Sequence, residues 1–130
     1  MILKHVGVVC SSEENADRFY GQLLGLEKTG PNTLPESISQ VIFGIDSELT
    51  IINYTGEGLH FEIFVYSAQR QNADRIEHTC VEVEDLDTFL EKCRSMEVEI
   101  RQVRRDRGPL TFIADYDGNL FEVKGGSSNK

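Results

Sequence analysis

The sequence has little positive charge, few cysteines and no long apolar segment. Its 130 residues contain 13 Lys and Arg against 22 Asp and Glu, a formal net charge of −9. Such an acidic chain is poorly suited to coat a nucleic acid or an anionic membrane. No apolar run approaches the roughly 20 residues of a membrane span, and no secretory signal precedes Cys10. We therefore expect a cytoplasmic protein that binds neither nucleic acid nor membrane.

Cysteine usage argues against a disulfide scaffold. The three cysteines, Cys10, Cys80 and Cys93, form no Cys-x-x-Cys pair, and an odd, sparse count suits a reducing compartment. Packing in the interior is expected for each, and Cys80 is not expected to act as a nucleophile, since no obvious base follows it. With 39% hydrophobic and 27% charged residues the composition is that of a globular chain, and the length is that of one domain.

What the sequence does contain is an imperfect internal repeat. Each half begins with a short β-branched run, at residues 2–10 and 75–83, and each run carries a histidine near its start, His5 and His78. Apolar residues at helical spacing follow both runs. The two halves are therefore expected to open with a strand followed by a helix.

Capping signals locate the two predicted helices. In the first half Ser11 and Glu14 have the spacing of a capping box, and Gly25 offers a C-terminal stop. In the second half Asp85 is the predicted N-cap of an apolar stripe that reaches Met96. Each stripe is expected to lie against a sheet.

Three extended segments are predicted to close each half. They are residues 37–45, 48–54 and 59–66 in the first half, and residues 98–103, 110–114 and 119–124 in the second. The turns Gly56-Glu57-Gly58 and Asp117-Gly118 join the last two segments of each half. Both halves thus read β-α-β-β-β, which predicts an α+β fold.

The two halves are unequal, and the chain offers places for the difference. The first half is the longer, and the surplus is expected in a loop around residues 30–35. We predict module boundaries at about 1–67 and 74–125, with a polar linker at 67–74 and a frayed tail at 127–130.

Four polar residues of the predicted strands share one face of the sheet. Alternation along a strand turns them away from the helices. They are His5, Glu62, His78 and Glu122. If that face curves around a cavity, two imidazoles and two carboxylates converge in a site suited to Zn, Ni, Co, Mn or Fe(II). Solvated or paired side chains are the alternative for any single one of them, whereas the duplicated register favours the site.

The sequence also resembles a known family. The passages that carry the resemblance are Leu3-Lys-His5-Val-Gly-Val, Phe19-Tyr20 with Leu24-Gly25-Leu26, and Phe112-Ile-Ala-Asp115-Tyr-Asp117-Gly-Asn119-Leu-Phe-Glu122-Val. Together with the paired modules they are similar to the vicinal oxygen chelate superfamily, which includes glyoxalase I, bleomycin resistance proteins and dioxygenases. The resemblance implies a single domain over residues 1–126 with a glyoxalase-like fold. In that fold two tandem βαβββ modules form a curved mixed sheet around a cavity.

The ligand set is closest to that of glyoxalase I, the lactoylglutathione lyase. The implied ligands of one divalent ion are His5, Glu62, His78 and Glu122. His60 is a rival to Glu62, because both project from the same face of one strand. The gap-free match between residues 58–63 and 118–123 favours Glu62.

The resemblance implies a metal-dependent lyase or isomerase. A divalent ion polarises a carbonyl, and a carboxylate then moves the α proton through an enediolate. Glu122 is the leading base and Glu62 the second candidate, since the module symmetry prevents a firm choice. The substrate would be a glutathione hemithioacetal or a coenzyme A thioester. Four arginines are available to bind its anionic groups. The alternative is that they belong to a solvated loop without such a role. They are Arg101, Arg104, Arg105 and Arg107.

Two departures from the family pattern keep alternatives open. Val9 stands where glutathione-using relatives often carry Arg, and coenzyme A epimerases often have Gln in place of Glu62. A methylmalonyl-CoA epimerase-like enzyme and a non-catalytic binding protein of the bleomycin-resistance type are the alternatives. A dioxygenase or a fosfomycin-type transferase fits less well, because both use two His and one carboxylate. The resemblance also implies a homodimer, with the metal site within one chain or shared across the dimer.

Overall fold

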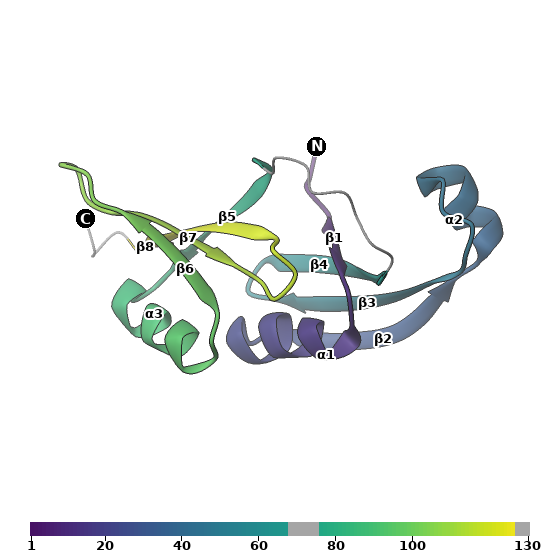
Figure 1. The fold of residues 1–130 in the computed structure, drawn as a ribbon, viewed down its shortest axis with the longest axis horizontal. Helices are drawn as coiled ribbons and strands as arrows, with labels where there is room; N and C mark the ends of the chain where they lie inside the picture. Colours follow the sequence, from purple (N-terminus) through teal and green to yellow (C-terminus); the bar gives the residue numbers. More distant parts are fainter. Residues whose placement is uncertain (68–75, 127–130) are drawn as a thin grey trace. The chain divides into compact units, whose positions relative to one another are not determined.

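The computed structural model of the protein describes residues 1–67 and 76–126. Their contacts divide the chain into two compact units, each with one four-stranded sheet, which we term module 1 and module 2. In Figure 1 module 1 is coloured from purple to teal and module 2 from green to yellow. The predicted tail and nearly all of the predicted linker lie outside the described residues.

Module 1 forms a mixed sheet with the strand order β1-β4-β3-β2. Its elements are β1 (Val6–Cys10), α1 (Glu13–Ala16), η1 (Asp17–Leu23), β2 (Glu27–Leu34), α2 (Glu36–Phe43), β3 (Leu49–Gly56) and β4 (Leu59–Val65). The first strand is parallel to β4, and the other neighbours are antiparallel. The π-helix η1 directly continues α1.

The described part of module 2, residues 76–126, repeats the same topology without a second helix. Its elements are β5 (His78–Val83), α3 (Leu86–Ser95), β6 (Glu99–Val103), β7 (Leu110–Ala114) and β8 (Leu120–Gly125). The strand order is β5-β8-β7-β6, with β5 parallel to β8. The predicted α+β fold class is therefore confirmed. Each module contains a strand, a helix and three further strands, as predicted, although one strand of module 1 lies elsewhere in the sequence than expected.

The helix of module 1 begins one residue later than its predicted capping box. The N-cap is Ser12, not Ser11, because the Ser12 hydroxyl oxygen accepts the backbone N–H of Asn15 at 3.1 Å. In module 2 the predicted cap is confirmed, since the carboxylate of Asp85 accepts the N–H of Thr88 at 3.1 Å.

The structure corrects the prediction for residues 27–45. The segment 37–45, predicted as extended, forms α2, and the expected loop at 30–35 lies largely within the edge strand β2. The β-branched composition of the segment suggested a strand, whereas its apolar residues recur at helical spacing. Gly44, at φ 69°, ends α2 by donating its N–H to the carbonyl of Gln40 at 3.0 Å.

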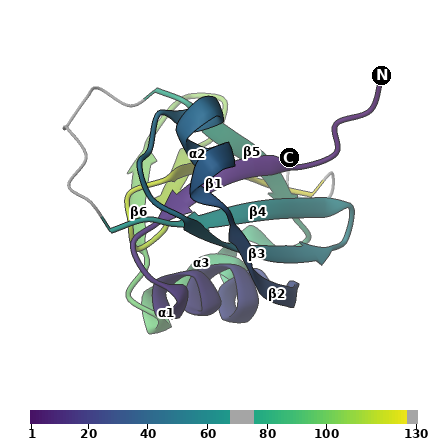
Figure 2. The same ribbon diagram turned by 90° about the vertical axis from the view of Figure 1, so that its right-hand side faces the viewer.

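The helix α2 is the insertion that makes module 1 the longer of the two. It lies on the opposite side of the sheet from α1 (Figures 1 and 2). A helix on that side covers part of the sheet face that α1 and η1 leave open, and module 2 has no described counterpart of it.

In each module the core lies between the sheet and its first helix. In module 1 the ring of Tyr20 lies 5.7 Å from Tyr54 and 5.3 Å from Phe61, and the Tyr54 hydroxyl donates to Asp17 Oδ1 at 2.7 Å. In module 2 α3 contacts β6 and β8, and its buried residues include Cys93. None of the described helices is long and apolar enough to cross a membrane.

Candidate metal centre

Module 1 brings its predicted histidine and glutamate together. His5 stands one residue before β1, and its Nε2 lies 3.4 Å from Oε1 of Glu62 on β4. The parallel register pairs Gly7 with Glu62, so the side chains of residues 5 and 62 leave the same face of the sheet. Only 25% of the Glu62 side chain is exposed.

Module 2 makes the same pair. The Nε2 of His78 lies 3.8 Å from Oε1 of Glu122, whose side chain is 19% exposed. The other ring nitrogen of His78, Nδ1, lies 2.8 Å from the carbonyl oxygen of Ile76. Because a carbonyl only accepts, Nδ1 is the donor of this hydrogen bond, and Nε2 is the nitrogen that faces Glu122.

Each pair fits half of a metal site. Ligand atoms about 2.0–2.2 Å from an ion lie roughly 3.0–3.5 Å apart at ordinary coordination angles. The observed distances of 3.4 Å and 3.8 Å place one nitrogen and one oxygen of each module within reach of an ion after a small adjustment. Within the described ranges, no three His, Cys, Asp or Glu side chains are gathered to hold a metal ion. Each module therefore presents two side chains of the kinds that bind metal ions.

A second histidine and an asparagine extend the pair in module 1. The ring of His60 lies 5.4 Å from that of His5, and its Nε2 is hydrogen-bonded to Oδ1 of Asn53 at 2.7 Å. Across the β3–β4 ladder Asn53 is directly opposite Glu62. No pattern in the sequence predicts Asn53 as a neighbour of the pair, since its place there depends on the pairing of two strands.

The neighbours of the pair in module 2 are different. Phe112 is opposite Glu122, and its ring meets that of His78 edge-on at 5.0 Å. The ammonium of Lys124 lies 3.7 Å from Oε2 of Glu122. Module 2 thus surrounds its pair with an aromatic ring and a cation, where module 1 has polar hydrogen-bonding side chains.

Cys80 lies next to the pair of module 2, opposite Glu122 in the β5–β8 register. It is exposed, although packing in the interior was predicted for it. Partial desolvation, and then the negative charge of Glu122, raise the pKa of its thiol. A raised pKa lowers the fraction of the thiol that is present as the nucleophilic thiolate.

The four arginines proposed for substrate binding do not form one group. Arg101, on β6, donates from Nε to Oε2 of Glu99 at 2.5 Å and is exposed. Arg104 and Arg105 line an open pocket of about 870 Å³ at the β6–β7 turn, and Arg107 is not among its lining residues. A role for these side chains in substrate binding stays a prediction.

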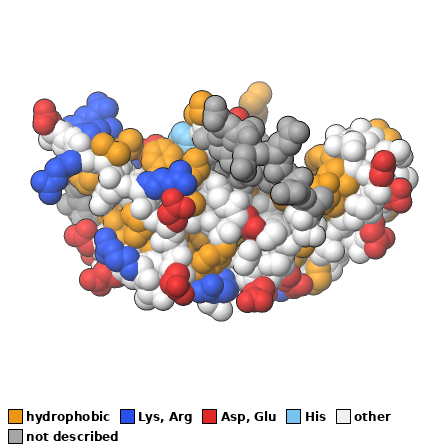
Figure 3. All heavy atoms as spheres, viewed as in Figure 1, with side chains coloured by type: hydrophobic (Ala, Val, Ile, Leu, Met, Phe, Trp, Pro, Cys, Tyr) orange, Lys and Arg blue, Asp and Glu red, His pale blue; other side chains and the backbone are white. Residues whose placement is uncertain are grey.

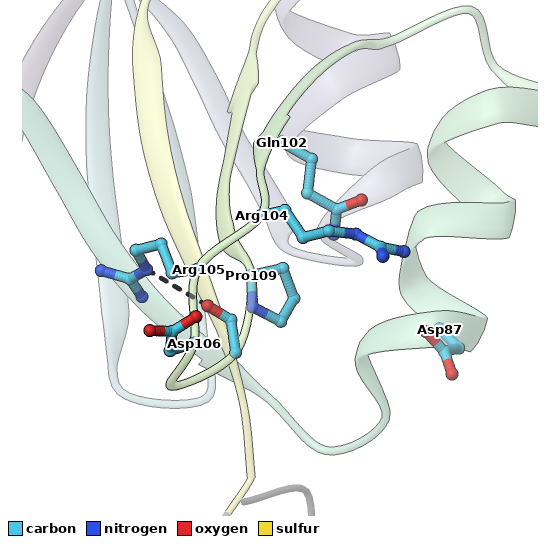
Figure 4. Close-up of a pocket in the computed structure, with 7 residues that line it drawn as sticks. Asp87, Gln102, Arg104, Arg105, Asp106 and Pro109 are labelled. Carbon is cyan, nitrogen blue, oxygen red and sulfur yellow. Dashed lines mark hydrogen bonds between the residues drawn. The ribbon is translucent and has the colours of Figure 1, made fainter.

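Figure 4 shows the pocket at the β6–β7 turn. Arg104 extends beside Gln102, whereas Arg105 folds back and donates to the carbonyl of Gly108 at 3.2 Å. The side-chain amide nitrogen of Gln102 donates a hydrogen bond to the hydroxyl of Thr111, its partner across the β6–β7 ladder, at 2.9 Å. The residue after Thr111 on β7 is Phe112, which lies opposite Glu122. Because successive residues of a strand point to opposite faces, Thr111 and its partner Gln102 lie on the other face of the sheet from Glu122.

Comparison with known proteins identifies the family of the chain. Residues 2–123 match the Glyoxalase/Bleomycin resistance protein/Dioxygenase superfamily. No curated protein matches the sequence.

Similar folds are found among solved structures. A glyoxalase family protein from Enterococcus faecalis is 21% identical, with a TM-score of 0.72 over 94% of this chain and 95% of that chain. The fosfomycin resistance protein FosX from Mesorhizobium loti is 14% identical, with a TM-score of 0.70 over 99% and 96%. A FosX variant from Listeria monocytogenes, complexed with Mn(II) and a dihydroxypropylphosphonic acid, is 18% identical, with a TM-score of 0.70 over 98% and 93%. At these identities the likeness shows the fold. With the family match over residues 2–123, the chain belongs to the glyoxalase/bleomycin resistance protein/dioxygenase superfamily.

Proposed function

We propose that the chain is a metal-dependent lyase or isomerase in which the two half-sites together hold one divalent ion. The proposed ligands are His5, Glu62, His78 and Glu122. The observation that carries the proposal is that both modules set an imidazole Nε2 within 3.8 Å of a carboxylate oxygen at the same register position. Nitrogen and oxygen donors without a thiolate favour Zn, Ni, Co, Mn or Fe(II).

The proposed reaction moves a proton on a carbon next to a carbonyl. A bound divalent ion supplies stabilisation of the negative charge that develops on the carbonyl oxygen. The carboxylate of Glu122 takes the proton and returns it to the neighbouring carbon or to the other face, with Glu62 as the second candidate for this role. Such a transfer leaves the redox state of the substrate unchanged, so the reaction needs no electron donor or acceptor.

A second candidate reaction shares this chemistry. Val9 lines an uncharged pocket of module 1, whereas a glutathione-binding enzyme is expected to carry a cation there. Epimerisation of a coenzyme A thioester, as in a methylmalonyl-CoA epimerase-like enzyme, needs the same proton transfer without that cation. It is therefore kept beside the glyoxalase I-like reaction on a glutathione hemithioacetal.

Metal analysis of the purified protein tests the proposal. We expect about one divalent ion per chain after incubation with each candidate metal and removal of the excess. His5→Ala and His78→Ala should each abolish stoichiometric binding, because each removes one of four ligands. Glu91→Gln, on the exposed side of α3, is the matched control and should bind metal as the wild type does.

Two outcomes would contradict the proposal. A wild-type protein that binds none of the candidate ions would favour a non-catalytic binding protein of the bleomycin-resistance type. A metal-loaded protein that exchanges no substrate proton with deuterated water, for either the methylglyoxal–glutathione hemithioacetal or methylmalonyl-CoA, would exclude both candidate reactions. Sedimentation of the same samples tests the homodimer that the resemblance implies.

A further inference from the structure

We propose that the substrate of the metal centre carries an apolar group about the size of a benzene ring, which binds in a pocket of module 1 beside His5 and Glu62. The inference rests on the proposed function, because the half-sites would bind the oxygen-bearing end of the same molecule. It adds the substrate class, which neither the fold nor the ligand set defines.

The pocket has a volume of about 180 Å³ and an apolar lining. Strand β1 contributes Gly7 and Val9 to its wall, and strand β4 contributes Phe64. Tyr66, just after β4, and Phe43, at the end of α2, also line it. None of the residues that line it carries a charge. An engineered apolar cavity of about 150 Å³ takes up benzene, so a phenyl ring or a branched alkyl group matches this volume.

The pocket is on the same face as the histidine–glutamate pair. The β1–β4 register sets Gly7 opposite Glu62 and Val9 opposite Phe64. Residues two apart on a strand share a face and are separated by about 6.6 Å, so Phe64 is the next side chain along that face from Glu62. The exposed Gly7 has no side chain to stand between the pair and the pocket. A molecule of modest size therefore spans both.

The outer wall of the pocket comes from the inserted helix. The ring of Phe43, at the end of α2, meets that of Phe64 edge-on at 5.3 Å and is 48% exposed. In Figure 3 hydrophobic side chains reach the surface beside α2, at the right of the view. Such exposed aromatic surface next to a polar pair is the arrangement expected of a ligand site that is apolar at one end.

Module 2 offers no equivalent pocket wall at the matching positions. The residues that correspond to Gly7, Val9 and Phe64 in the β5–β8 register are Cys80, Glu82 and Lys124. Two of these three are charged, which disfavours an apolar group. The apolar end of the substrate is thereby assigned to module 1.

The same lining disfavours a carboxylate in this place. An ionised carboxylate of glutathione would lose hydration in the pocket without gaining a charged or strongly polar partner there. An apolar substituent gains free energy from the same burial. The substrate class we infer is thus a carbonyl compound with an aromatic or branched aliphatic substituent.

Binding of two hydroxamates to the cobalt-loaded protein tests the inference. Acetohydroxamate and benzohydroxamate present the same chelating oxygens and differ in the apolar group. We expect benzohydroxamate to bind about ten- to a hundredfold more tightly in calorimetry, the gain typical of burying a phenyl group. Equal affinities for the two probes would overturn the inference while leaving the proposed function intact.

Paired variants of α2 locate the binding site of the phenyl group. Phe43→Ala removes a wall of the pocket and should lower benzohydroxamate affinity about fivefold or more, with acetohydroxamate and metal binding unchanged. Val41→Ala is the matched control, because Val41 is 79% exposed on the same helix and does not line the pocket. Equal effects of the two substitutions would contradict the assignment.

A metal-free arm separates this inference from the proposed function. Benzyl alcohol, titrated into the metal-free protein, should shift the amide resonances of Gly7 and Val9 saturably and leave those of Cys80 and Glu82 unchanged. If the protein binds no metal but shows these shifts, the proposed function fails and the apolar site stands. Absence of these shifts would overturn the apolar site. So would shifts that disappear as the protein concentration rises, because a second copy of the chain would then be the occupant of the pocket.

Discussion

Modules 1 and 2 present the same pair of side chains and surround it with different chemistry. The residue opposite the glutamate is Asn53 in module 1 and Phe112 in module 2. In the same registers His60 of module 1 corresponds to Leu120 of module 2. The register between the first and last strands therefore places each histidine and glutamate on one face, whereas the neighbouring strand determines which other side chains surround the pair. The similarity of the two histidine–glutamate pairs does not extend to the side chains around them.

The largest expected effect is a loss of turnover that differs between variants of the two glutamates. Glutamine keeps the size of the side chain and removes the carboxylate that moves the proton, so Glu122→Gln should lower kcat by about 10²–10⁴. Glu62→Gln should lower it less, because Glu62 is the second candidate for the base. Turnover is measured at saturating metal, with metal content determined for each variant.

The reverse order of effects would place the base in module 1. Equal and complete loss of turnover in both variants, accompanied by loss of metal, would show that both glutamates act as ligands alone. The relative turnover of the two variants therefore shows which module supplies the base.

The next effect concerns the two candidates for the ligand on β4. His60→Leu gives module 1 the residue that module 2 has at this position, and we expect metal affinity to change by no more than a few fold. Glu62→Leu should lower it by about a hundredfold or more, since it removes a charged ligand. The hydrogen bond that already engages His60 Nε2 with Asn53 supports this order. Competition with a chromogenic chelator measures both affinities, and the opposite order would make His60 the ligand.

The sequence pattern predicted the two histidine–glutamate pairs better than their surroundings, for a physical reason. Alternation along a strand predicted that His5 and Glu62 share a face, and the structure places their side chains 3.4 Å apart. The contact of His60 with Asn53 depends on the register between β3 and β4, which no local pattern determines. The strand prediction for residues 37–45 was wrong because the β-branched composition favours a strand, whereas the spacing of the apolar residues and Gly44 favour a helix.

A smaller effect comes from the cores, where the modules also differ. The buried Tyr54 of module 1 corresponds to Ile113 of module 2, and its hydroxyl donates to Asp17. Tyr54→Phe should lower the free energy of unfolding by about 1–2 kcal/mol at pH 8, because it removes this hydrogen bond. Urea unfolding of the two proteins measures the difference.

The difference in stability between the wild type and Tyr54→Phe should depend on pH. Burial, and then the hydrogen bond to Asp17, raise the pKa of Tyr54 above its usual value. Above about pH 10 the unfolded tyrosine loses its proton while the folded one keeps it, so the contribution of Tyr54 is present below pH 10 and is lost as the pH rises further. The stability advantage of the wild type over Tyr54→Phe should therefore shrink between pH 9 and pH 11. An advantage that grows over this range would contradict the assignment.

The smallest effect tests α2, the insertion that has no counterpart among the described residues of module 2. Gly44 ends α2 at φ 69°, a conformation that costs an L residue with a side chain about 1 kcal/mol, and a Cβ there meets no atom within 4 Å. Gly44→Ala should thus destabilise by about 1 kcal/mol through the backbone alone. Gly21→Ala is the control, since Gly21 lies within η1 and its Cβ would sit in ordinary contact, 3.9 Å from the ring of Tyr54. That substitution should be neutral or stabilising in urea unfolding. Equal losses in the two variants would mean that packing, not the left-handed turn after α2, sets the cost.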